Sequence, residues 1–134
     1  MPLLNDLIGL GMPAEHASVL SSFTVGSAPA NSSSGSLTAT GTTIADALAL
    51  TSFINLVGTT AASTGVRLPD VPVGNIVVVQ NNGANALNVF PHVATGTLNG
   101  GTAGAAVTCA AAAGNICIRR SATDWIVFVV AKEA

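Results

Sequence analysis

Charge is the scarcest property of this sequence. Its 134 residues include four Lys or Arg and six Asp or Glu, 7% in all, against about 25% in typical domains. The cations form no basic stripe, which excludes the phosphate-neutralising contacts that supply most nucleic-acid affinity and argues against attraction to an anionic membrane. We therefore expect no nucleic-acid partner and no membrane partner.

Long apolar runs and catalytic motifs are absent as well. No stretch approaches the ~18 apolar residues of a transmembrane helix, and MPLLNDLIGLGMP, which has no Lys or Arg, is a poor signal peptide. The carboxylates are isolated in sequence, no GxSxG is present, and the glycine-rich segment 96–104 matches neither a P-loop nor a complete GxGxxG. We expect no enzymatic activity, no cofactor and no small-molecule substrate.

Metal-ligating and redox-active residues are few. Cys109 and Cys117 flank a predicted hairpin turn, so a disulfide is one interpretation, and two small buried hydrophobic side chains are the one we favour. There is no CxxC, and neither His16 nor His92 has ligand partners at metal-site spacing, which predicts no metal site. For His92 we predict a structural role, with a pH-sensitive interface contact as the alternative.

What the chain does contain is organised in three segments. Residues 1–23 predict a short N-terminal helical arm, because apolar residues recur on one helical face and Pro13 fits a first helical position. Such short helices are marginal alone and need a surface to lie on: the chain's own body, a sister subunit or a foreign protein. The candidate contact residues are Leu3, Leu4, Leu7, Ile8 and Leu20. Residues 24–36, rich in Gly, Ser and Ala, predict a flexible linker.

Residues 37–134 predict a β body. Runs rich in Val, Ile, Thr and Phe lie between Gly and Asn turn signals at intervals typical of a sandwich or barrel. We therefore expect a mainly β fold, an antiparallel β-sandwich or jelly-roll-like barrel, with residues 44–53 irregular. The expected strands are 37–42, 53–58, 65–68, 75–81, 86–91, 105–110, 115–120 and 125–131.

Two of these expected strands are apolar on both faces. Residues 76–79 read IVVV and residues 125–130 read WIVFVV, whereas a solvated antiparallel strand alternates apolar and polar. Either the second face of these strands is covered by the chain's own helical arm or a loop, or it packs against another subunit. The scarcity of charge favours the second arrangement, a homotrimer with this face at the three-fold axis. We expect Trp125 to lie in the core and Arg120 to form an ion pair with Asp124.

The β body resembles a module of tailed-phage virion proteins. The resemblance covers most of the chain and rests on TGVRLPDVPVGNIVVVQNNGANALNVFP, on TLNG followed by an Ala-rich strand, and on a closing strand that begins with Trp. The N-terminal GLGMPAEHA also looks like short helical openings of phage structural proteins. These motifs are structural and do not identify the surface bound.

The resemblance implies a virion protein: a capsid decoration (cement) protein, a head fibre or a related spike. Because there is one β body and no repeated shaft, we favour a decoration protein that binds the outer capsid surface as a homotrimer and stabilises the head. Its partners would be its own copies and the major capsid protein, and the five N-terminal residues above would contact the capsid or other subunits. Such a protein is made in the host cytoplasm and resides on the capsid surface of the virion. The alternative is a receptor- or glycan-binding module of a head fibre or tail appendage, for which exposed aromatic residues on distal loops would be the sign.

Overall fold

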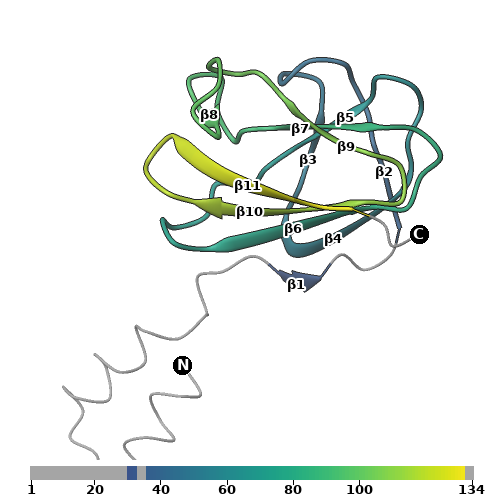
Figure 1. The fold of residues 1–134 in the computed structure, drawn as a ribbon, viewed down its shortest axis with the longest axis horizontal. Coiled ribbons are helices and arrows are strands. Elements are labelled where there is room, and N and C mark those ends of the chain that lie inside the picture. Colours follow the sequence, from purple (N-terminus) through teal and green to yellow (C-terminus); the bar gives the residue numbers. More distant parts are fainter. Residues whose placement is uncertain (1–29, 33–35, 132–134) are drawn as a thin grey trace, which may run out of the picture.

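The computed structural model describes residues 30–32 and 36–131, which form eleven strands and no helix (Figure 1). The expected arm of residues 1–23 lies outside the described residues. The strands are β1 (Ala30–Ser32), β2 (Leu37–Thr38), β3 (Leu48–Ala49), β4 (Ser52–Thr59), β5 (Gly65–Arg67), β6 (Ile76–Asn81), β7 (Leu87–Phe90), β8 (Thr97–Leu98), β9 (Val107–Cys109), β10 (Gly114–Arg119) and β11 (Asp124–Val130).

From β2 to β7, consecutive strands belong alternately to two sheets. In the first sheet β2, β4 and β6 lie side by side in parallel, and in the second sheet β3, β5 and β7 do the same. Each pair of consecutive strands therefore makes one coil of the chain, and the coils stack through parallel pairing. This arrangement resembles a β-solenoid.

The chain reverses direction after β7. β9 pairs antiparallel with β7, β10 pairs antiparallel with β6, and β11 pairs antiparallel with β10. The first sheet has the order β1–β4–β6–β10–β11–β8, with β2 also on β4, and the second has the order β3–β5–β7–β9. Antiparallel strands thus close one side of the stacked coils.

The expected antiparallel β-sandwich or jelly-roll-like barrel is wrong for the described residues. From β2 to β7 the polar turns carry the chain from one sheet to the other instead of folding a strand back on its neighbour, so same-sheet neighbours are parallel. The segment 110–113 between the cysteines is likewise no hairpin, because β9 belongs to the second sheet and β10 to the first. Residues 44–53 contain a turn, then β3 and the start of β4.

Asn81 fixes the corner where β6 passes towards β7. Its side-chain amide donates to the carbonyls of Asn85 at 2.9 Å, Cys109 at 3.1 Å and Ala110 at 3.1 Å, and its Oδ1 accepts from the backbone N–H of Gly83 at 2.9 Å. At Gly83 a Cβ would overlap the side chain of Thr60 on the preceding coil, so only glycine permits this close approach. One buried amide therefore ties two corners of the stack together.

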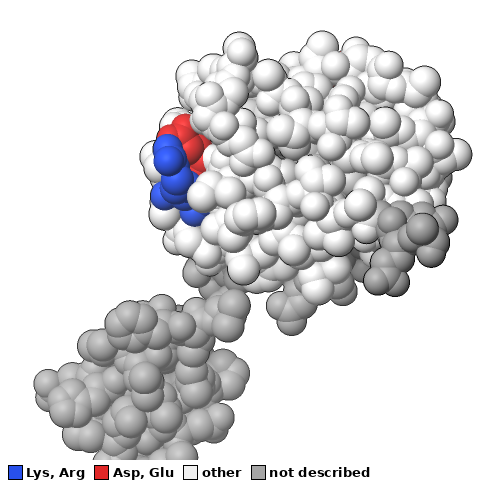
Figure 2. Space-filling model, viewed as in Figure 1, with Lys and Arg blue, Asp and Glu red and all other residues white. Residues whose placement is uncertain are grey.

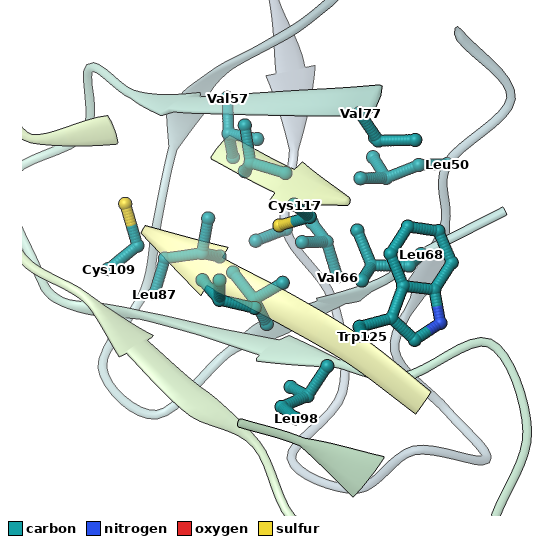
Figure 3. Packing of buried hydrophobic residues seen from close by; sticks show 14 of the residues in the cluster. Leu50, Val57, Val66, Leu68, Val77, Leu87, Leu98, Cys109, Cys117 and Trp125 are labelled. Atoms are coloured by element: carbon teal, nitrogen blue, oxygen red, sulfur yellow. The ribbon is translucent and has the colours of Figure 1, made fainter. Parts of the chain in front are cut away.

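The core lies between the two sheets (Figure 3). It is built from small branched side chains that fit closely stacked coils, such as Val57 and Val77 of the first sheet and Val66 of the second. Trp125, which is only 1% exposed, fills one end of the core, as its sequence position predicted. Along β6, Val77 and Val79 are buried in this core, whereas the alternate residues Ile76 and Val78 lie on the opposite face of the sheet.

Candidate functional site

The outer face of the first sheet is apolar. Because side chains alternate along each strand, the residues on β4, β6, β10 and β11 that do not point into the core share this face, and the register aligns them in rows. One row runs straight across the four strands from Ile54 through Val78 and Ile116 to Phe128. We call the following nine residues the apolar face: Ile54, Leu56, Ile76, Val78, Ile116, Ile118, Ile126, Phe128 and Val130.

Much of this face is open to solvent. Phe128 on β11 and Ile54 on β4 lie at the two ends of one row, and they are 54% and 48% exposed. Ile116, which lies between them on β10, is half-buried by its neighbours. Soluble monomers rarely expose a contiguous apolar patch of more than a few hundred Å², and larger patches mark interaction sites. The face is therefore a candidate binding surface.

Most charged side chains of the described residues lie apart from the apolar face, but Asp124, which is on the same side of β11 as Ile126, borders it and pairs with Arg120. In the view of Figure 2, the charged side chains gather at one end of the body, where β10 passes into β11. The rest of the described surface in this view carries no charged side chain. That end carries Asp70, Arg119, Arg120 and Asp124. The two regions have to be considered separately, because one offers apolar contact and the other offers hydrogen bonds and charge.

Arg119 is the centre of the charged end. Its guanidinium and Nε donate to the carboxylate of Asp70, to the carbonyl of Val71, to the carbonyl of Ser121 at 3.1 Å and to the carbonyl of Ala122 at 2.6 Å. Arg119 therefore joins the loop before β6 to the turn between β10 and β11. Its hydrogen bond and charge lower the pKa of Asp70, whose side chain is 79% exposed.

His92 lies between Arg119 and Trp125. The indole N–H of Trp125 donates to Nδ1 of His92 at 3.0 Å, and Nη2 of Arg119 lies 3.1 Å from Nε2 of His92. Burial, and then the charge of Arg119, lower the pKa of His92, whose side chain is only 4% exposed. A neutral ring can accept from Trp125, so the geometry agrees with the predicted structural histidine.

The charged end is thus a structural brace. Asp70, His92 and Arg119 are each held by the contacts described above, which join loops that are distant in sequence. The predicted ion pair between Arg120 and Asp124 is confirmed at 3.1 Å, and Thr97 also donates to Asp124 at 2.7 Å. These hydrogen bonds and the charge of Arg120 lower the pKa of Asp124.

The two cysteines are buried and free, as we favoured over a disulfide. Burial raises the pKa of Cys109, and burial raises that of Cys117 to about 12. Both side chains belong to the core between the sheets. They act as small apolar groups and not as reactive thiols.

The N-terminal candidate residues lie outside the described residues: Leu3, Leu4, Leu7, Ile8 and Leu20. Within residues 30–32 and 36–131, no group of three or more His, Cys, Asp or Glu side chains could hold a metal ion. The same residues contain no helix that is long and apolar enough to cross a membrane.

Sequence reasoning located the apolar face in part. It singled out 76–79 and 125–130 as apolar on both sides, but it gave no weight to Ile54 or to the alternating β10, whose outward residues complete the face. It did not find the association of Asp70, His92, Arg119 and Trp125. Asp70 and His92 both lie at corners of the coils, but these corners can be recognised only after the coils are known, so the sequence alone carried no usable signal.

No protein-family model, no curated protein and no solved structure is similar enough to this chain to match it.

Proposed function

We propose that the protein is a structural component of a tailed-phage virion: a capsid decoration protein that binds the outer capsid surface as a homotrimer and stabilises the head. The resemblance of the sequence to phage virion modules suggests this class. The single observation that supports it best is the uncharged apolar face, because such a surface is suited to lie against protein. The scarcity of charge over the whole chain points the same way.

The charged end supports a structural role over a catalytic one. A general acid or base must reach a substrate, but His92 is enclosed by Trp125 and Arg119, and the guanidinium of Arg119 is occupied by carbonyls and Asp70. These groups tie together loops that are distant in sequence. Such contacts suit a protein that has to bridge neighbouring capsid subunits without deforming.

Stabilisation of the head would arise from many weak contacts. Each trimer would contact the major capsid protein, and we assign the N-terminal residues Leu3, Leu7 and Leu20, with their neighbours, to capsid or subunit contacts. Because the subunits of one trimer are linked, binding at one site raises the effective concentration of the others at their sites. Modest contacts repeated by symmetry would then resist expansion of the shell.

The experiment is reconstitution on capsids of the encoding phage that lack this protein. We expect the full chain to bind at many copies per particle and to raise the temperature at which the particles release DNA. A chain lacking residues 1–23 should remain a folded β body and bind particles much more weakly. Undiminished binding by this truncated chain would contradict the role of the N-terminal residues.

The copy number separates this function from its alternative. If the protein occupied only a few sites per particle and bound oligosaccharides on a glycan array, it would be a receptor-binding module of an appendage. The structure offers less support for that alternative, because the single Trp of the chain, Trp125, is buried in the core. Failure of the protein to bind any capsid would contradict the decoration function.

A further inference from the structure

The apolar face has the regularity of a packing surface. Its rows cross four adjacent strands, and the row from Ile54 to Phe128 crosses them in register without a polar residue. We infer that this face is the contact between copies of this chain, so that the apolar faces of the trimer's subunits meet one another around its three-fold axis. The inference rests on the self-association in the proposed function and assigns it to specific residues.

The face has the size of the centre of a subunit contact. Four strands about 4.8 Å apart and five residues at about 3.3 Å give a flat area of roughly 320 Å². A stable interface buries about 800 Å² per partner, so the face would form the apolar centre of such an interface and the surface around it would supply the rest.

The chemistry of the face favours an identical partner. None of its residues is ionisable, and the charges at its border, Asp124 and Arg120, already pair with each other. Two such faces can therefore meet without burying an unpaired charge, which is the largest cost of burying a surface. Gln80 is the one polar side chain in the rows, and its amide already donates to Oδ1 of Asn82 at 3.2 Å. The chain itself therefore supplies a surface that matches the face in polarity and extent.

Phe128 is the expected anchor of the contact. It is the largest and the most exposed side chain of the face, and it lies on β11 beside Ile116 of β10. Aromatic side chains surrounded by smaller apolar ones dominate the binding energy of many interfaces. Loss of the phenyl ring should therefore weaken association more than loss of an equally exposed apolar side chain elsewhere.

A different occupant is the chain's own N-terminal segment. β1 pairs with β4 at one edge of the first sheet, so residues 1–29 join the body close to Ile54. If that segment covered the face of its own chain, the protein would be monomeric with the face hidden. Removal of residues 1–23 would then create an oligomer, whereas contact between copies predicts that the full chain already is one.

Sedimentation equilibrium of the full chain tests the inference. We expect an oligomer at micromolar concentration, and we expect the double variant Ile54→Thr/Phe128→Thr to raise the dissociation constant at least about tenfold. Thr is β-branched and suits a strand, so the two substitutions remove apolar surface and leave the strands intact. The matched control is Val73→Thr, which changes a similarly exposed valine in the loop before β6, off the face. The control should assemble like the wild type.

A second measurement does not depend on the fold of the double variant. Phe128→Cys should form a disulfide between copies under mild oxidation, seen as a covalent dimer on a denaturing gel, while Val73→Cys should not. The native Cys109 and Cys117 are buried and should form no cross-link between copies. A monomeric full chain, unchanged association of the double variant, or no cross-link through Cys at position 128 would each overturn the inference.

These outcomes are independent of capsid binding. A chain that assembles through this face but binds no particle would keep the inference and contradict the decoration function. A chain that binds particles as a monomer would contradict the inference and the proposed trimer, and leave decoration itself standing.

Discussion

The indole N–H of Trp125 donates to Nδ1 of His92, with the two nitrogen atoms 3.0 Å apart and the rings edge-on at 5.9 Å between centroids. Trp125 can donate there only if Nδ1 carries no proton. The other ring nitrogen of His92 faces the guanidinium of Arg119. The single proton of the neutral ring is therefore on Nε2, and a second proton, on Nδ1, would meet the indole N–H and add a positive charge beside Arg119, so the neutral ring is favoured.

This contact predicts a pH dependence of stability. Burial, followed by the charge of Arg119, lowers the pKa of His92, against the smaller opposing effects of Asp70 and the carbonyl of Ala122. The unfolded chain, with a pKa of about 6.5, then binds more protons than the folded chain, so the stability is fully present above about pH 6.5 and is lost as the pH falls through the unfolded and then the folded pKa. We expect the free energy of unfolding by urea to decrease from about pH 8 to about pH 5.

Titration of Asp46, Asp70 and Asp124 does not contribute to the change in stability between about pH 8 and about pH 5. The pKa values of Asp46, Asp70 and Asp124 are lowered, so their contributions are lost only as the pH falls below about 4. The variant His92→Gln retains an acceptor for Trp125 and should flatten the profile between about pH 8 and about pH 5. A wild-type profile that is already flat there would show that His92 is not held neutral.

Arg119 and Arg120 are adjacent in sequence and should differ strongly in importance. Arg119→Met leaves the carbonyls of Val71, Ser121 and Ala122 without their donor, so we expect a loss of about 3 kcal/mol in urea unfolding. Arg120→Met removes only an exposed ion pair and should cost less than about 1 kcal/mol. Equal losses for the two variants would contradict the brace.

Asn81 and Asn82 offer a second adjacent pair. Asn81→Ala removes a buried amide that joins two corners of the coils, and we expect it to cost about 2–3 kcal/mol. Asn82 is exposed, and its side chain accepts only from Gln80, so Asn82→Ala should cost less than about 0.5 kcal/mol. Thermal and urea unfolding of the two variants measure the difference.

The thiols should be unreactive in the folded protein. Burial raises the pKa of both Cys109 and Cys117, the latter to about 12, so little thiolate forms at about pH 8. An aromatic disulfide reagent should label neither thiol rapidly in buffer and both in concentrated urea. Rapid labelling without urea would mean that the end of the core at β9 opens readily.

The positions of strands were predictable from the sequence, but their arrangement was not. The expected 75–81 and 125–131 coincide closely with β6 and β11, because β-branched runs bounded by turn residues have few alternatives. A turn such as Asn82-Gly83, however, looks the same whether the chain folds back in one sheet or crosses to another. The unbroken IVVV run was a signal of parallel pairing that we read only as evidence of a covered face.

The candidate site was predictable to the same degree. The apolar face follows from alternation once strands are known, so its half on β6 and β11 was accessible. The brace was not, because Asp70, His92 and Arg119 come from three separate corners and each residue is unremarkable in its own neighbourhood. Only the stacking of the coils brings them together.

The parallel stack also determines how this body can change in length. The coil that begins with β4 pairs in parallel with β2 of the coil before it and with β6 of the coil after it. A duplicated coil inserted within this stretch would lengthen both sheets while β9, β10 and β11 still sealed the last one. The outer surface would grow by one strand with each insertion, so this architecture can evolve larger contact areas without redesigning either end.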